Sequence, residues 1–210
     1  MRLTDPRLAA ILEREHAAAA AQRAVPHAAR EAGRTDFRVS DRQRTSYLSI
    51  GRDQGRWLHG LVRATGARTI VEFGTSFGIS ALYLASAARA TGGTFTGTEY
   101  HAEKAESARA TLAEAGLAEA DIRHGDARET LADLSGPIDL LFLDGAKDLY
   151  RPMLDLLAPG LADHAVVVAD NIAPDRPEIA NFLAAINVPE EWTTSILEFE
   201  KGGMSFSVRA

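Results

Sequence analysis

With 210 residues, the chain is long enough to form one hydrophobic core and short for two domains. Hydrophobic residues make up 46% and charged residues 25% of the composition, which excludes a disordered chain, a collagen-like fibre and a coiled coil. The absence of cysteine excludes disulfides and cysteine nucleophiles, and it leaves only oxygen and imidazole ligands for a metal ion.

The net charge of -6 is unevenly distributed. Residues 1–66 carry 12 arginines, no lysine and 7 acidic residues, whereas residues 67–210 carry 11 basic and 22 acidic residues. The three lysines of the chain are Lys104, Lys147 and Lys201, so a lysine inside a chemical motif stands out from an arginine background. The apolar stretches are shorter than the ~18 residues of a membrane helix, and the first residues lack the apolar core of a signal peptide. We therefore expect a cytoplasmic protein without membrane contact.

Residues 1–66 are predicted to be mainly helical, with breaks at Pro26 and Gly33 and a helix over residues 53–65 that ends at Gly66. Beyond residue 67, short apolar runs alternate with helical patterns. The predicted strands span residues 69–73, 94–98, 121–124, 138–143, 165–169, 193–199 and 204–208. The predicted helices among them span residues 79–89, 102–115, 128–134, 149–157 and 178–185.

This alternation indicates βαβ units and therefore an α/β fold with a doubly wound, Rossmann-like, mostly parallel sheet. The last two strands are joined through Gly202-Gly203, which predicts an antiparallel hairpin at the C-terminus. Residues 1–66 are interpreted as a helical extension of the domain whose core is formed by residues 67–210.

A glycine-rich turn follows the first predicted strand, in the sequence Val71-Glu72-Phe73-Gly74-Thr75-Ser76-Phe77-Gly78. Glycines permit a tight turn, and the helix that begins after Gly78 offers unpaired N–H groups to a ligand. The Gly-x-x-x-Gly spacing differs from the Gly-x-Gly-x-x-Gly pattern of dinucleotide-binding proteins. The alternative for this motif on its own is two glycines that only turn the chain.

Acidic residues end the next two predicted strands. Glu99 lies 25 positions after Gly74, where an acidic side chain can accept hydrogen bonds from ribose hydroxyls, and the alternative is a solvated glutamate. Asp126 can either cap the helix that follows it or contact an adenine amino group.

Oxygen-bearing side chains follow the fourth and fifth predicted strands. Asp144, Asp170 and Asn171 form a set of hard oxygen ligands of the kind that Mg²⁺ takes. Lys147 lies three residues after Asp144, and a partly desolvated lysine beside a cation can act as a general base. The alternative for Lys147 is a surface lysine paired with Asp144 or Asp148.

These motifs resemble those of class I S-adenosylmethionine-dependent methyltransferases, specifically the small O-methyltransferases similar to catechol O-methyltransferase. The resemblance runs from about Gly51 to the C-terminus and is carried by Val71 to Gly78, Gly97 to Glu99, Gly125 to Ala127, Leu143 to Tyr150 and Ala169 to Asn171. It implies S-adenosylmethionine and magnesium as cofactors, a small-molecule acceptor with adjacent oxygens, and a homodimer.

The resemblance also implies a role for each matching residue. Glu72, Gly74, Ser76 and Gly78 would bind the methionine part of the cofactor, Glu99 its ribose, and Asp126 and Ala127 its adenine. Asp144, Asp170 and Asn171 would bind magnesium, with Asp144 also near the cofactor, and Lys147 would deprotonate the acceptor hydroxyl. Glu198 occupies a place comparable to a glutamate that contacts the second hydroxyl in catechol enzymes.

Two alternative functions stay open at this point. The arginine-rich first third suits a methyltransferase acting on tRNA or another nucleic acid, although its interspersed acids and missing aromatic residues argue against this. The fold also suits an NAD-dependent oxidoreductase or a non-catalytic nucleotide-binding module, and the missing Gly-x-Gly-x-x-Gly counts against the oxidoreductase.

Overall fold

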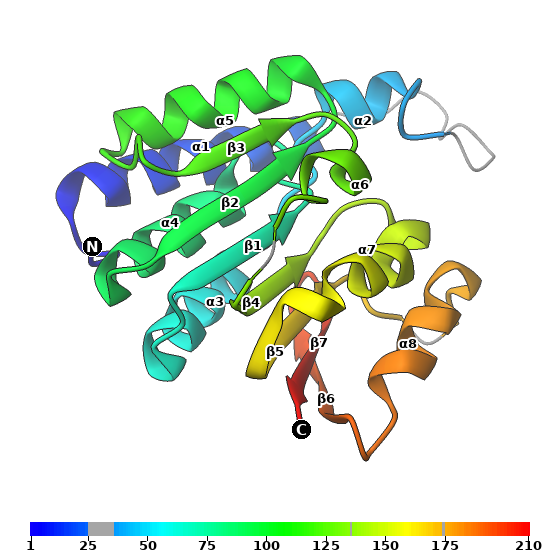
Figure 1. The fold of residues 1–210 in the computed structure, drawn as a ribbon. Coiled ribbons are helices and arrows are strands. Elements are labelled where there is room, and N and C mark those ends of the chain that lie inside the picture. Colours follow the sequence, from blue (N-terminus) through cyan, green and yellow to red (C-terminus); the bar gives the residue numbers. More distant parts are fainter. Residues whose placement is uncertain (25–35, 135, 174) are drawn as a thin grey trace.

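The computed structural model describes residues 1–24, 36–134, 136–173 and 175–210, so the predicted breaks at Pro26 and Gly33 lie outside the described residues. Seven strands form one sheet (Figure 1): β1 Thr69–Phe73, β2 Thr94–Glu99, β3 Asp121–His124, β4 Ile138–Leu143, β5 Leu161–Asp170, β6 Trp192–Phe199 and β7 Gly202–Arg209. The helices are α1 Pro6–Ala24, α2 Asp41–Thr45, α3 Arg52–Thr65, α4 Ile79–Thr91, α5 Ala102–Glu114, α6 Ala127–Thr130, α7 Tyr150–Leu157 and α8 Ala180–Ile186. Short 3-10 turns are η1 Lys147–Leu149, η2 Ala158–Gly160 and η3 Pro177–Ile179.

The strand order is β3-β2-β1-β4-β5-β7-β6. Strands β1 to β5 pair in parallel, and β7 pairs antiparallel with both β5 and β6. The predicted doubly wound sheet with an antiparallel C-terminal pair is therefore confirmed. The chain direction across the sheet reverses between β1 and β4, and ligands of such sheets bind beyond the carboxyl ends of the strands at this point.

The sheet is buried on both faces. Leu140 and Phe142 of β4 pack into the cluster formed with α1, α3, α4 and α5, whereas Leu141 and Leu143 face the cluster formed with α6, α7 and α8. Figure 1 shows the two groups of helices on opposite sides of the sheet. Consecutive apolar residues in β4 thus serve two cores, which explains the uninterrupted apolar run in the sequence.

The N-terminal helices share the first of these cores. Leu8 of α1 is fully buried against it, and His16 lies 3.0 Å from the hydroxyl of Tyr83 on α4. Leu58 and Val62 give α3 its buried face, which packs on α4. None of the helices in the described part of the chain is both long and apolar enough to cross a bilayer.

Two predicted elements differ from the structure. The helix predicted over residues 128–134 is a single turn, because the Arg123 guanidinium donates to the carbonyl of Thr130 and to Asp133 and so holds the following residues in a turn. Strand β5 begins at Leu161, four residues before the predicted start. Its first half contains the polar residues Asp163 and His164 and pairs with β4 across a β-bulge, so the continuous apolar run marks only its second half.

Candidate active site

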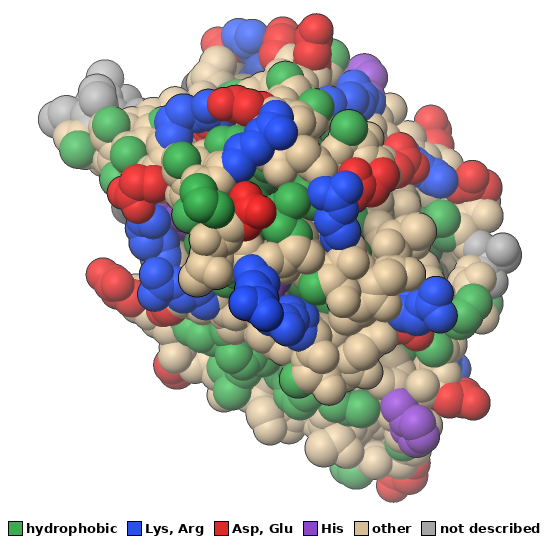
Figure 2. All heavy atoms as spheres, turned by 90° about the vertical axis from the view of Figure 1, so that its left-hand side faces the viewer, with side chains coloured by type: hydrophobic (Ala, Val, Ile, Leu, Met, Phe, Trp, Pro, Cys, Tyr) green, Lys and Arg blue, Asp and Glu red, His purple; other side chains and the backbone are tan. Residues whose placement is uncertain are grey.

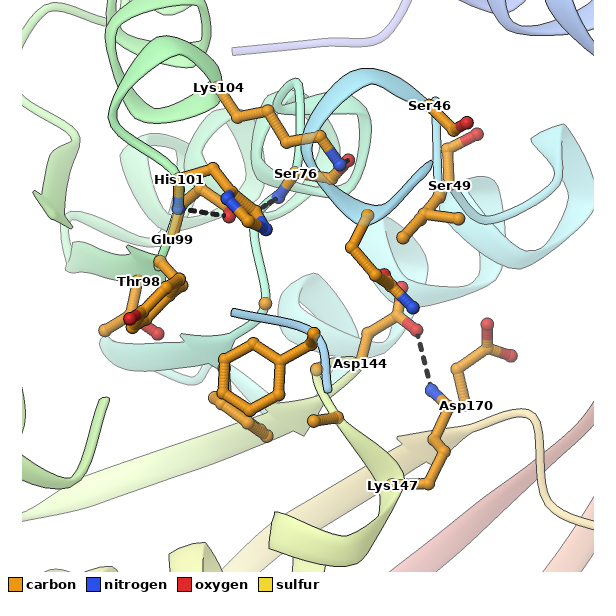
Figure 3. A pocket seen from close by; sticks show the side chains of 18 of the residues that line it. Ser46, Ser49, Ser76, Thr98, Glu99, His101, Lys104, Asp144, Lys147 and Asp170 are labelled. Carbon is orange, nitrogen blue, oxygen red and sulfur yellow. Dashed lines mark hydrogen bonds and ion pairs between the residues drawn. The ribbon is translucent and has the colours of Figure 1, made fainter. Parts of the chain in front are cut away.

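A cavity of about 530 Å³ lies beyond the carboxyl ends of β1, β2, β4 and β5 and is covered by residues near α2. Figure 3 shows Glu99 and Ser76 on one side of it and the group Asp144, Lys147 and Asp170 on another. Most of the predicted site residues line it, namely Gly74, Ser76, Glu99, Asp126, Ala127, Asp144, Lys147, Asp170 and Asn171. Glu72, Gly78 and Glu198 do not line it.

The loop between β1 and α4 needs glycine at both ends. Gly74 and Gly78 have φ values of 97° and 93°, which disfavour any residue with a side chain. A Cβ on Gly74 would lie 2.5 Å from the backbone nitrogen of Gly145, so the loop packs directly on the turn after β4. Ser76 between them has a φ of 50°, a conformation that costs a non-glycine residue energy and that the surrounding contacts must stabilise.

Glu99 supplies one of those contacts. One of its carboxylate oxygens accepts a hydrogen bond from the backbone nitrogen of Ser76 at 2.8 Å, and the other accepts one from the backbone nitrogen of His101 at 2.9 Å. Each oxygen keeps a free lone pair for a ligand. The side chain thereby fixes the glycine loop and lines the cavity at the same time.

Asp126 lines the cavity as the N-terminal cap of α6. Its carboxylate accepts from the backbone nitrogen of Arg128 at 3.0 Å and pairs with the guanidinium of the same residue at 2.5 Å. These hydrogen bonds to Arg128 hold the pKa of Asp126 below its usual range. Of the two alternatives open from the sequence, capping is the one seen in the structure.

Glu72 lies beneath the loop. Its side chain is fully buried, and one oxygen accepts a hydrogen bond from the Thr75 hydroxyl at 2.7 Å. The other oxygen has no partner among the described residues, and burial raises the pKa of Glu72 to about 7. An orphaned buried carboxylate oxygen fits a cationic group on a ligand above it.

Two of the predicted site residues, Gly78 and Glu198, do not line the cavity. A Cβ on Gly78 would lie 3.2 Å from the Cβ of Ala108, so this glycine allows α4 to approach α5. Glu198 is exposed on β6 opposite Gly203. The structure therefore gives no support to Glu198 as a residue that contacts a ligand in this cavity.

Lys147 is held in the opposite wall. Its Nζ lies 3.2 Å from Asp144 and 2.5 Å from the hydroxyl of Tyr150, which itself donates to the backbone carbonyl of Asp170 at 2.9 Å. Only 16% of the Lys147 side chain and 9% of the Asp144 side chain are exposed. Burial raises the pKa of Asp144 well above its usual range, against the opposing effect of the Lys147 ammonium group. Lys147 does pair with Asp144, but inside the cavity wall and not on an open surface.

The predicted metal ligands lie together. Asp170 accepts a hydrogen bond from Gln54 at 2.8 Å on one oxygen and from the Asn171 amide at 3.1 Å on the other, and burial raises its pKa. No group of three His, Cys, Asp or Glu side chains in the described part of the chain is arranged to bind a metal. Two carboxylates and one amide remain, and two desolvated carboxylates whose pKa values are raised fit a divalent cation in donor type and charge.

Sequence reasoning missed several residues of the site. Gln54 and Tyr150 orient Asp170 and Lys147, and Lys104 and His101 line the cavity beside Glu99. The three-residue spacing from Lys147 to Tyr150 was a usable signal for one of them. The scarcity of lysine was a second usable signal, because all three lysines of the chain line this one cavity.

The sequence and the fold match those of known methyltransferases. Residues 71–172 match the family model described as a methyltransferase domain. No curated protein matches the chain. The matched segment begins in β1 and ends just after Asn171, so it contains the strands and loops that build most of the cavity.

Solved structures extend the match beyond this segment. The O-methyltransferase TomG from Streptomyces achromogenes, involved in tomaymycin synthesis and solved with SAM, is 29% identical, with a TM-score of 0.70 over 78% of this chain and 82% of that chain. The cofactor-bound Rv0187 from MTB is 27% identical, with a TM-score of 0.71 over 98% and 90%. The O-methyltransferase from Bacillus cereus, solved with SAH, shares the fold at 23% identity, with a TM-score of 0.74 over 96% and 91%.

The fold and these matches define the class of the protein. The fold is that of class I S-adenosylmethionine-dependent methyltransferases, and the matched domain and these structures support an S-adenosylmethionine-dependent O-methyltransferase, as the motifs indicated.

Proposed function

We propose that the protein transfers the methyl group of S-adenosylmethionine to a hydroxyl of a small molecule that carries a second oxygen next to it, with a divalent cation such as Mg²⁺. This proposal rests on how the side chains are arranged in one cavity. Glu99 and the glycine loop line one side, and Asp144, Lys147, Asp170 and Asn171 line another.

The cofactor half of the cavity is built by the glycine loop, Glu99 and Asp126. Gly74 and Ser76 would lie against the methionine part, Glu99 would accept the ribose hydroxyls, and Asp126 and Ala127 would border the adenine. Asp144 follows β4, which pairs with β1, so the loop that would hold the methyl donor lies beside the acceptor half of the cavity.

The acceptor half is built by Asp144, Lys147, Asp170 and Asn171. A cation bound by the oxygens of Asp144, Asp170 and Asn171 would lower the pKa of an acceptor hydroxyl and fix its orientation. Lys147, in its neutral form, would accept the hydroxyl proton at Nζ while Tyr150 holds that nitrogen in place. The residues of this half would hold the deprotonated acceptor oxygen for in-line attack on the methyl group that S-adenosylmethionine would supply, with its sulfur leaving as a neutral thioether.

The test is a pair of substitutions in the acceptor half. Lys147→Met and Asp144→Asn should each reduce kcat on a catechol acceptor by about 100-fold or more, because a general base typically contributes 10²–10⁴-fold. In Lys147→Met, the affinity for S-adenosylhomocysteine, measured by calorimetry, should stay within about threefold of the wild type, since the cofactor half is untouched. Arg151→Gln, which removes an exposed ion pair on α7, is the matched control and should leave kcat unchanged.

The metal requirement has its own measurement. Activity should disappear after treatment with a chelator and return on addition of Mg²⁺. Full activity of the chelated enzyme would refute the metal part of the proposal and leave methyl transfer standing. Unchanged turnover of Lys147→Met would refute the role of the base.

We favour a small molecule over a nucleic acid as the acceptor, because arginines of the first third form ion pairs with acidic residues of the same chain. Arg14 pairs with Glu114 at 2.7 Å, and Arg52 pairs with Glu13 at 2.9 Å. On the face drawn in Figure 2, basic and acidic side chains lie interspersed. A small-molecule acceptor therefore stays our proposal, and the homodimer stays a prediction to be checked by sedimentation.

A further inference from the structure

Lys104 is a buried lysine that the proposed reaction does not use. It lies in the first turn of α5, is 1% exposed, and lines the cavity. Its Nζ donates to the Ser76 hydroxyl at 3.2 Å and lies 5.2 Å from the centre of the Phe77 ring. No carboxylate among the described residues comes within 4.0 Å of it.

An ammonium group in this position lacks a counter-charge. Taking an ion out of water costs several kcal/mol, and one hydroxyl and one aromatic face offset only part of that cost. Glu99 is the nearest opposing charge, but both of its oxygens already accept hydrogen bonds from backbone N–H groups. Burial accordingly lowers the pKa of Lys104 to about 8.

Two further buried polar atoms of the cavity lining lack a hydrogen-bond partner within the described part of the chain. The Nε2 atom of His101 and the hydroxyl of Ser49 are buried without a partner among the described residues, and both residues line the cavity. Figure 3 shows Lys104 next to Ser76, on the other side of the cavity from Lys147 and Asp170. An anionic group bound here would therefore belong to the ligand that lies on the glycine loop and not to the methyl acceptor.

We propose that Lys104 binds the α-carboxylate of the methionine part of the cofactor, and that this ion pair selects S-adenosylmethionine and S-adenosylhomocysteine over nucleosides without an amino-acid end. The inference rests on the proposed binding of the methionine part against Ser76. The carboxylate is the anionic group of this cofactor, and Lys104 is the cation that touches the loop residue beside it.

The experiment compares the binding of two ligands that differ in whether they carry the amino-acid end of the cofactor. S-adenosylhomocysteine carries the carboxylate, whereas 5′-methylthioadenosine keeps the adenosine and the thioether and lacks the amino-acid end. Calorimetry should show that Lys104→Met raises the Kd for S-adenosylhomocysteine by about 30-fold or more, as expected for loss of a partner from a desolvated charge pair. The Kd for 5′-methylthioadenosine should change less than threefold.

Lys104→Arg serves as the charge-conserving variant and should bind S-adenosylhomocysteine more tightly than Lys104→Met does. The melting temperature of each variant confirms that it is folded. Met matches the length of the lysine stem and removes the buried charge, so the fold should tolerate it.

Proton uptake gives a second readout. At pH 8 part of the Lys104 population is neutral, and a bound carboxylate should draw a proton onto it. The apparent binding enthalpy of S-adenosylhomocysteine should then differ between phosphate and Tris buffers by more in the wild type than in Lys104→Met. The titratable groups facing Lys104 are Glu99 from β2 and His101 at the start of its own helix, and both are present in the two proteins.

The outcomes separate the two proposals. An equal loss of affinity for both ligands in Lys104→Met would mean that Lys104 only holds Ser76 in place, and it would overturn the inference. Unchanged affinity for S-adenosylhomocysteine in that variant would overturn it as well, with the proposed function intact. A wild-type protein that binds neither ligand would overturn the proposed function and this inference together.

Discussion

At the scale of single residues, the site depends on side chains that act through their neighbours. Lys147 reaches the cavity in a defined position because Tyr150 accepts its hydrogen bond and anchors it to the carbonyl of Asp170. Gln54 does the same for Asp170, since its amide donates to the carboxylate while its own oxygen accepts from the Gly51 nitrogen at 2.6 Å. Tyr150 and Gln54 are thus positioning residues, fully buried behind the groups that meet the ligands.

Glu72 makes the stability of the ligand-free protein depend on pH. Its pKa in the folded state is about 7, above the 4.5 of the unfolded chain, so the folded state binds more protons between these values. Relative to Glu72→Gln, the wild type should therefore lose stability as pH rises from 4.5 to 7, by up to about 3 kcal/mol.

Urea unfolding of both proteins at pH 5 and pH 8 measures this difference. Gln is the matched replacement because it can still accept the Thr75 hydrogen bond without carrying a charge. If the free energy of unfolding changed with pH equally in the two proteins, the pKa of Glu72 would be the same in the folded and unfolded states.

The sequence indicated the charged ends of the strands but not their partners. Four acidic residues lie at or just after the ends of predicted strands, so their place at the carboxyl edge of the sheet was predictable: Glu99, Asp126, Asp144 and Asp170. Lys104 lies on a helix whose pattern looks solvated, and only the packing of α2 and the loop around Phe77 against α5 buries it. Contacts between segments this far apart in the chain leave no local pattern.

At the scale of elements, short strands were predictable even at the edge of the sheet, where β3 lies. Three predicted strands match β1, β3 and β4 to the residue, because each is a short run bounded by turn residues. The start of β5 and the end of α6 were not predictable, because a bulge and the long-range contacts of Arg123 determine them. Short strands thus follow the local pattern, whereas contacts with other segments determine the start of β5 and the end of α6.

The helix α1 contributes to stability through its apolar stripe. Leu8→Ala should lower the free energy of unfolding by about 2–5 kcal/mol, because Leu8 is fully buried in the core shared with α4. The neighbouring Arg7 is exposed, and Arg7→Ala should change stability by less than about 0.5 kcal/mol. Urea denaturation of the two variants checks this, and equal stabilities would show that α1 is not part of the cooperative fold.

At the scale of the whole molecule, ligand binding should be coupled to folding. The cavity takes its lining from segments between Gln22 and Lys201, so a ligand that fills it bridges most of the chain. At 100 times its Kd, S-adenosylhomocysteine should stabilise the fold by about 2.7 kcal/mol, which a thermal shift measures. NAD at the same concentration should leave the melting temperature unchanged, and a larger shift with NAD would favour the oxidoreductase alternative.

The two halves of the cavity differ in how freely their sequence can change. Three exposed basic residues line the cavity from α2 and from connections between elements, and substitutions at such positions usually cost little stability: Arg42, Arg176 and Lys201. Gly74 has a positive φ and packs against Gly145, so most substitutions there would strain the fold. Descendants of this chain could therefore diverge in the acceptors they methylate while keeping the same methyl donor.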